Sequence, residues 1–263
     1  MNKLIITATT ANSWLNPDLK NWPLNTDQLV EEAIHCAEAG ASILHVHLPR
    51  SPEATEVVAK IRERTDAIIQ AGMSSYPIEE RTTDFEAKPD MVSIILNHHD
   101  EHFPEMHVNR LHPLEEFEGY SGKCREYGVK PEWEVWHTGS YWNLRYMIDR
   151  GWFEGPHVLT LFFGWPGGTW SPPTPDSYLY RVRHMPENCL HTVSVMGEEQ
   201  TEIATLAIAM GGNVRVGTED YPFIREGVPA KNNAELVERM VGISREMGRE
   251  VANPSEARKI IGI

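Results

Sequence analysis

Two histidines one residue apart, His45 and His47, interrupt the apolar segment ASILHVHLP (41–49). Side chains at positions i and i+2 of a strand point to the same face, so a strand here places both imidazoles on one side. Neutral imidazole is a common zinc donor, but a catalytic zinc site needs a third protein ligand. Spacing alone therefore favours a metal pair and the polar face of a half-buried strand equally.

The best source of a third ligand is the segment NVRVGTED (213–220). On a strand, Arg215, Gly217 and Glu219 share one face, so Glu219 and Asp220 emerge at its C-terminal end. Two histidines and a glutamate with an open position form a normal zinc site. Arg215 lies among valines and needs a partner such as a carboxylate. The alternative to a metal-site role is that Glu219 and Asp220 are solvated acids in a loop.

An alternation of apolar segments and helical patterns determines where these groups would lie. We expect strands at 3–9, 41–49, 66–75, 90–96, 130–136, 156–164, 189–195 and 213–220. We expect helices at 26–40, with Thr26 as N-cap, and at 52–65, 112–128, 140–151, 174–185, 199–212 and 232–248. Eight strands alternating with helices over about 250 residues predict an α/β fold, a (β/α)8 TIM barrel in one domain, 1–263.

The barrel is favoured over an open doubly wound sheet. An open sheet would favour a glycine-rich fingerprint after its first strand, whereas ITATTANSW (6–14) contains no glycine. In a TIM barrel the chemistry takes place at the C-terminal ends of the strands. His45, His47 and Glu219 all meet that condition.

Composition excludes several function classes. A net charge of −14 without a basic stripe argues against nucleic-acid binding. No segment approaches the roughly 18 apolar residues of a membrane span, and the N-terminus lacks the apolar core of an export signal. The three cysteines, Cys36, Cys124 and Cys189, are widely spaced, so we expect core thiols and a cytoplasmic protein.

Two further segments contain candidate groups. In FFGWPGGTW (162–170), Gly167 and Gly168 would let backbone N–H groups approach an anionic or carbonyl oxygen, although composition alone indicates only a tight turn. NHHDEHF (97–103) contains three histidines, which we expect in a loop after the fourth strand and for which a metal role is poorly supported.

A series of motifs extends over nearly the whole chain: LIITAT, EAGASILHVH, EERTTDFEAKPDMVS, VKPEWEVW, FFGWPGG, NVRVGTED and a tail from 232 to 263. In order and spacing these motifs resemble the β-keto acid cleavage enzymes. The resemblance implies a TIM barrel, a homotetramer, and zinc bound by His45, His47 and Glu219. It also implies a β-keto acid and acetyl-CoA as co-substrates.

The resemblance further implies a mechanism, in which zinc as a Lewis acid stabilises the enolate of the β-keto acid. Asp220 would be the base, aided by Arg215 and by a serine after the third strand, either Ser74 or Ser75. The enolate would attack acetyl-CoA, and cleavage would release acetoacetate and a new acyl-CoA. Glu134 falls on a family position near the metal, although an acid near the start or on the outer face of a strand explains it equally well.

Several positions depart from the family pattern. Trp14 stands where aminohexanoate-cleaving members carry a glutamate for the substrate amine, so a cationic substrate is not expected. Ile95 replaces an asparagine that holds the substrate carboxylate, while Ser93 keeps a hydroxyl nearby. VSVMGEEQ (193–200) carries acids where many relatives end a glycine-rich segment in arginine, which would weaken contact with a CoA phosphate.

Alternative functions follow from the same residues. The first is zinc-dependent condensation and cleavage of a β-keto acid with acetyl-CoA. The second is a zinc hydrolase of a small ester, lactone or amide, with Asp220 as base and water in the open metal position. The third is a metal-containing barrel that only binds a small acid. Dependence on CoA separates the first from the others.

Overall fold

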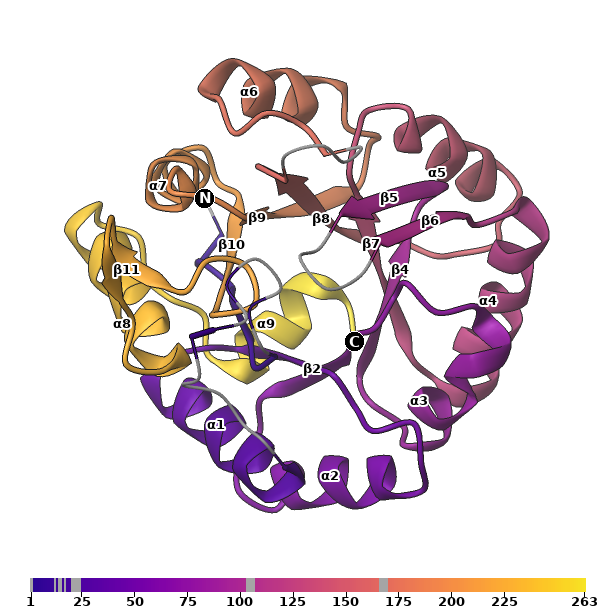
Figure 1. The fold of residues 1–263 in the computed structure, drawn as a ribbon. Coiled ribbons are helices and arrows are strands. Elements are labelled where there is room, and N and C mark those ends of the chain that lie inside the picture. The colour runs from indigo at the N-terminus through magenta and orange to yellow at the C-terminus, as the bar shows by residue number, and fades with distance from the viewer. Residues whose placement is uncertain are drawn as a thin grey trace.

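Eight parallel strands form a closed barrel (Figure 1), which confirms the predicted TIM barrel. The computed structural model describes residues 2–11, 13, 16, 18–19, 25–102, 107–165 and 170–263. Around the barrel the strand order is β1-β10-β9-β8-β7-β4-β3-β2. The strands are β1 (Ile6–Thr9), β2 (Ile43–Val46), β3 (Ile68–Ala71), β4 (Met91–Ile95), β7 (Lys130–Val135), β8 (His157–Phe163), β9 (Cys189–Val195) and β10 (Asn213–Val216).

A ring of helices covers the outside of the barrel (Figure 1). These are α1 (Thr26–Ala39), α2 (Glu53–Arg62), α3 (Thr82–Glu86), α4 (Leu114–Tyr127), α5 (Ser140–Asp149), α6 (Pro175–His184), α7 (Gln200–Ala209) and α8 (Asn233–Glu246). A 3-10 turn, Ile78–Arg81, precedes α3. None of the described helices is long and apolar enough to cross a membrane.

The ends of α1 show how local chemistry sets a helix boundary. The side chain of Asn25, not of Thr26, caps the helix by accepting the N–H of Gln28 at 2.9 Å. The predicted Thr26 cap was therefore wrong by one residue, and Thr26 begins the helix. At the other end Gly40 adopts a left-handed conformation with φ of 116°, which glycine tolerates without a Cβ clash.

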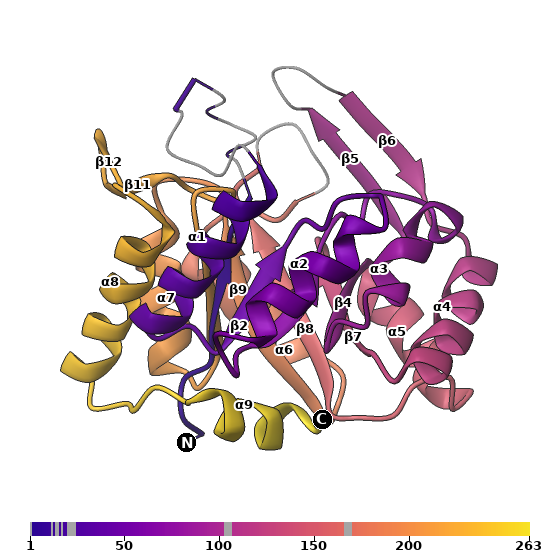
Figure 2. The ribbon, with the colours of Figure 1, turned by 90° about the horizontal axis from the view of Figure 1, so that it is seen from below.

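The end of the barrel at which the strands begin is closed by a helix that the sequence pattern did not predict, α9 (Pro254–Ile261) (Figure 2). Its Ala257 and Ile261 pack on an apolar layer formed by Ile5, Ile43, Ile68, Met91 and Val158. Because this end is sealed by apolar packing, the opposite, open end is left for chemistry.

The alternation of each strand sorts its side chains between the lumen and the helices. On β2, Leu44 and Val46 belong to the main core under the helices, whereas His45 lies on the other face, inside the barrel. Above the apolar floor the lumen is polar, and its buried side chains include Gln70, Ser93 and Glu132. This polar layer supports the groups at the open end.

The histidine-rich segment after β4 is a hairpin rather than the expected loop. Strands β5 (His98–His102) and β6 (His107–Leu111) pair antiparallel and project beyond the open end of the barrel (Figure 2). Exposed and half-buried side chains alternate along β6, which is the two-residue period of a strand. The loop prediction was wrong because His98–His102 pairs with the later segment His107–Leu111, a partner that the residues of NHHDEHF do not reveal.

The three cysteines are free thiols. Cys36 and Cys124 are buried, and burial raises the pKa of both. Cys189 is partly exposed at the start of β9, so the expectation that all three lie in the core was wrong for this residue.

Candidate metal centre and active site

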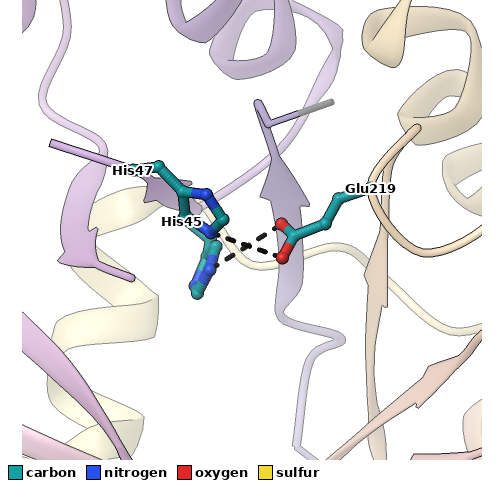
Figure 3. A group of neighbouring side chains, drawn as sticks. All are labelled: His45, His47 and Glu219. Atoms are coloured by element: carbon teal, nitrogen blue, oxygen red, sulfur yellow. Dashed lines mark ion pairs between the residues drawn. The ribbon is translucent and has the colours of Figure 1, made fainter. Parts of the chain in front are cut away.

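His45, His47 and Glu219 converge at the open end of the barrel (Figure 3). His47 Nε2 lies 3.3 Å from Glu219 Oε1, and His45 Nε2 lies 3.8 Å from Glu219 Oε2. Their ligand atoms all lie within 4.8 Å of one another. Across the parts of the chain that the structure describes, no other group of at least three His, Cys, Asp or Glu side chains has this spacing.

Barrel closure brings the glutamate to the histidines. Strand β1 pairs with β2 on one side and β10 on the other, so the ends of β2 and β10 are separated by one strand. After β10 the chain crosses tightly over β1 at Gly217, where φ is 156° and a Cβ would lie 2.0 Å from Thr9 Oγ1. Only glycine permits this approach, and it directs Glu219 toward β2.

The partners of His45 define its tautomer. Its Nδ1 lies 2.7 Å from Gln70 Oε1, an acceptor, so the ring donates through Nδ1 and keeps a lone pair on Nε2. Burial, with a contribution from Arg215, lowers the pKa of His45 to about 3, which keeps the ring neutral. The sequence analysis missed Gln70, although a glutamine in the apolar segment AIIQAG was a usable signal.

Glu219 is an ionised carboxylate with an unsatisfied oxygen. Burial opposes ionisation, but Arg215 and the two histidines outweigh it and bring the pKa of Glu219 well below its usual range. Its Oε2 is buried and has no hydrogen-bond partner among the described residues. A lone pair of His45 therefore faces a carboxylate oxygen with no proton between them, which is the arrangement that a divalent cation satisfies.

Arg215 joins the metal candidate to a second acid. It donates from Nε to Asp220 Oδ2 at 3.1 Å and from Nη2 to Asp220 Oδ1 at 2.9 Å, while Nη2 lies 3.1 Å from Glu219 Oε1. Ser194 Oγ also donates to Asp220 Oδ2, at 2.9 Å. Burial raises the pKa of Asp220 to about 6, against the opposing effect of Arg215. Ser194 was not predicted, although the alternation of β9 places it in the lumen.

Asp220 does not emerge at the mouth as the sequence suggested. Its side chain is fully buried, and it is not among the described residues that line the pocket. The physical reason is its two-point pairing with Arg215, which turns the carboxylate away from solvent. Arg215 and Glu219 do line the pocket.

A pocket lies directly at this site, and its described polar lining includes His45, His47, Ser74, Glu134, Arg215 and Glu219. Glu134 is on the inner face of β7, so the alternative of an outward-facing or strand-start acid is wrong. Ser74 Oγ donates to Glu134 Oε1 at 2.7 Å, and burial raises the pKa of Glu134. Ser75 also lines the pocket.

The remaining predicted substrate contacts are not in the described pocket. Ser93 is fully buried in the lumen, with Oγ 3.5 Å from His45 Nδ1, because it lies two residues deeper on β4 than Ile95. Trp14, Gly167 and Gly168 lie outside the described residues. These three assignments therefore stay predictions.

The described histidines of the hairpin and of the residues after it form hydrogen bonds and belong to no second metal group. His99 Nδ1 lies 2.9 Å from His112 Nε2, and His112 Nδ1 lies 3.2 Å from Glu116 Oε2. His107 Nε2 lies 3.3 Å from Asp100 Oδ1 on the outer part of the hairpin. Of the histidines of NHHDEHF, His99 and His98 have these described partners, with His98 Nε2 3.3 Å from Asn109 Oδ1, whereas the side chain of His102 lies outside the described part of the chain.

Comparison with known proteins finds relatives that match this chain over most of its length. The 3-keto-5-aminohexanoate cleavage enzyme of Acetoanaerobium sticklandii is 35% identical over 277 residues, covering 100% of this chain and 99% of that protein. A 3-dehydrocarnitine:acetyl-CoA trimethylamine transferase of Rhizobium meliloti is 28% identical, covering 90% and 88%.

Among solved structures, a binary complex of ObcA with oxaloacetate has the same fold. Its TM-score is 0.73 at 16% identity, covering 92% of this chain and 67% of that one. The family described as beta-keto acid cleavage enzyme matches residues 3–263. With a family match over nearly its entire length and a relative at 35% identity, this chain belongs to the beta-keto acid cleavage enzyme family.

Proposed function

We propose that this protein is a zinc-dependent enzyme that condenses a β-keto acid with acetyl-CoA and releases acetoacetate and a new acyl-CoA. The observation that carries the proposal is the position of the His45, His47 and Glu219 triad beside the Arg215–Asp220 pair at one pocket. The names of the relatives, a keto acid cleavage enzyme and an acetyl-CoA transferase, support the same chemistry.

The donor set fits zinc, because two neutral imidazoles and a carboxylate are ligands that zinc accepts while keeping a position open. His45, His47 and Glu219 would hold the ion. When bound, it would supply Lewis acidity to the oxygens of a keto acid. Gln70 fixes the tautomer of His45, and Arg215 keeps Glu219 ionised.

The other residues handle the proton and the substrate charge. Asp220 is the proposed base for the C2 proton of the keto acid. Arg215, which lines the pocket, and Ser194 orient its buried carboxylate, and this carboxylate must turn toward the pocket to reach the proton. The guanidinium of Arg215, which also lines the pocket, stabilises negative charge as it develops on the substrate. Ser74 and Glu134 form the polar wall beside it, with Ser75 as the alternative serine.

The reaction balances without an external oxidant or reductant. C2 loses a proton and bonds to the acetyl carbonyl carbon, and the CoA thiolate leaves. The thiolate then adds to the keto carbon of the original acid, and the bond between that carbon and C2 breaks. C2 regains a proton, so that acetoacetate and the new acyl-CoA are the products.

The domain organisation, oligomeric state and location of the enzyme are part of the proposal. We propose one catalytic domain, 1–263, acting as a cytoplasmic homotetramer on small acids and not on nucleic acid or membranes. The resemblance of the sequence to the family and its net charge of −14 support these points.

The deciding experiment is an incubation of the purified, zinc-loaded protein with a mixture of β-keto acids, with and without acetyl-CoA. We expect acetoacetate and a new acyl-CoA, detected by mass spectrometry, only when acetyl-CoA is present. Turnover that is independent of CoA, or ester and lactone hydrolysis, would establish the hydrolase alternative instead.

The metal assignment has its own test, which does not depend on activity. His45→Ala, His47→Ala and Glu219→Gln should each lower bound zinc from about one equivalent to a small fraction of it, measured by elemental analysis. His35→Ala, on the exposed face of α1, is the matched control and should keep its zinc. Full zinc content in all three variants would eliminate the site.

A further inference from the structure

The pocket has an apolar wall opposite the candidate metal site of His45, His47 and Glu219. This wall is formed by Trp136, Phe162, Trp170 and Met196, which all line the pocket and are nine-tenths or more buried. Phe162 packs edge-on against Trp170, with ring centroids 4.6 Å apart, and Trp136 lies 4.9 Å from Trp170. The proposed mechanism assigns these side chains no role.

The barrel order places this wall across from the histidines. Strand β8, which carries Phe162, is four positions from β2 in the ring of eight, so the two strands are diametrically opposite. A β-keto acid whose carboxylate and keto oxygens lie at the His45 and His47 side therefore extends its acyl group toward the wall. The acyl group is the part of the substrate that becomes the new acyl-CoA.

The charges of the pocket are confined to the metal side. Among the described lining residues, the acidic and basic side chains are those of the triad, Glu134 and Arg215. The wall itself contains none. The Arg215 guanidinium, 5.1 Å from the centre of the Phe162 ring, lies where the two sides meet. This guanidinium is paired with Asp220 and Glu219 on the metal side, where the proposed mechanism uses it, so it is not a counter-ion for an acyl group at the wall.

A charged acyl group would lose its hydration at this wall without gaining a counter-ion from the lining residues that the structure describes, which is unfavourable. An attraction between a cation and the rings offsets only part of that cost. An apolar group instead gains from burial against the rings.

We propose that the acyl group of the substrate is uncharged and apolar, of the branched aliphatic or aromatic type, and that Trp136, Phe162, Trp170 and Met196 select it. The inference rests on the proposed condensation with acetyl-CoA, because that reaction defines which part of the substrate reaches the wall.

The first test compares three substrates of matched size with the zinc-loaded enzyme and acetyl-CoA. These are 5-methyl-3-oxohexanoate, 5-amino-3-oxohexanoate, in which an ammonium replaces one methyl, and 3-oxoadipate, which ends in a carboxylate. We expect kcat/KM for the methyl compound to exceed both others by about 100-fold or more, since a site cannot easily accept an unpaired buried charge.

The outcomes separate the two proposals. If the ammonium or the carboxylate substrate is turned over as well as the methyl compound, the apolar assignment fails while the condensation stands. If none of the three, nor any other β-keto acid, yields acetoacetate, the proposed function itself fails.

A variant tests the wall directly. Met196→Glu places a carboxylate in it and should raise KM for the methyl substrate at least tenfold while improving kcat/KM for the ammonium substrate. Met210→Glu, at a position 52% exposed at the end of α7, is the matched control and should leave both values unchanged. Zinc content and melting temperature show whether the Met196 variant is folded. A folded Met196 variant with unaltered substrate preference would overturn the role of the wall. If the variant is unfolded, the comparison of the three substrates decides the proposal instead.

Discussion

Arg215 donates two hydrogen bonds to Asp220, from Nε to Oδ2 at 3.1 Å and from Nη2 to Oδ1 at 2.9 Å. The same Nη2 lies 3.1 Å from Glu219 Oε1. One guanidinium thus aligns a proposed metal ligand and a proposed base. A lysine could supply the charge but not this planar, two-point geometry. The pair is therefore the first target for mutation.

Asp220→Asn should abolish proton abstraction while sparing the metal. Loss of a general base lowers kcat by about 10²–10⁴-fold. The measurement is steady-state kcat together with deuterium exchange at C2 of the keto acid in D2O, above the spontaneous rate. Glu134→Gln is the matched comparison, because Glu134 lines the pocket and Asp220 does not. If only the Glu134 variant loses exchange, the base has been misassigned.

Gly72→Ala should prevent metal binding although Gly72 is not a ligand. A Cβ at Gly72 would lie 2.5 Å from His47 Cδ2 and 2.6 Å from His45 Nε2, so both rings must move. We expect at least tenfold weaker zinc binding in a chelator competition. Gly122→Ala in α4, whose Cβ would meet no atom within 4 Å, is the control and should bind zinc normally. Its helix should gain about 0.5–1 kcal/mol. Unaltered zinc affinity in the Gly72 variant would refute the positions of the His45 and His47 rings.

The two candidate serines can be separated by substitution. Ser74 donates to Glu134 at 2.7 Å and is buried, whereas Ser75 lines the same pocket and is less buried. Ser74→Ala leaves a buried Glu134 oxygen without its donor, so we expect kcat to fall about tenfold. Ser75→Ala should alter kcat by less than about twofold. The reverse order of effects would assign the role to Ser75.

Glu132 should make stability depend on pH. It is buried two residues below Glu134, and burial together with the charge of Glu134 raises its pKa to about 7. A raised folded-state pKa contributes stability below the unfolded value near 4.5, and that stability is lost as pH rises through about 7.

Glu132→Gln removes this titration, so the stability of the variant relative to the natural protein should increase as pH increases. We expect the difference in free energy of unfolding to shift by about 2 kcal/mol between pH 5 and pH 8. Urea unfolding at several pH values measures it. Glu238→Gln on the exposed face of α8 should show no such trend. A difference that is flat with pH would mean that Glu132 ionises normally.

The barrel and the histidine pair were predictable because they follow from local periodicity. A two-residue period places His45 and His47 on one face whatever the rest of the chain does. Alternating strands and helices favour a parallel barrel for the same reason. The hairpin of β5 and β6 was not predicted, because the polar segment His98–His102 lacks the apolar alternation that indicates a strand.

The sequence by itself determined the eight barrel strands, the pair of imidazoles and the acids of NVRVGTED, because each depends on neighbours a few residues away. Only the tertiary structure decided that Ser194 holds Asp220, that Ser74 rather than Ser75 holds Glu134, and that Asp220 is turned inward. It also set an aromatic wall opposite the histidines. These relationships depend on which strands face each other when the barrel closes and on the register between them, and neither is encoded in local spacing.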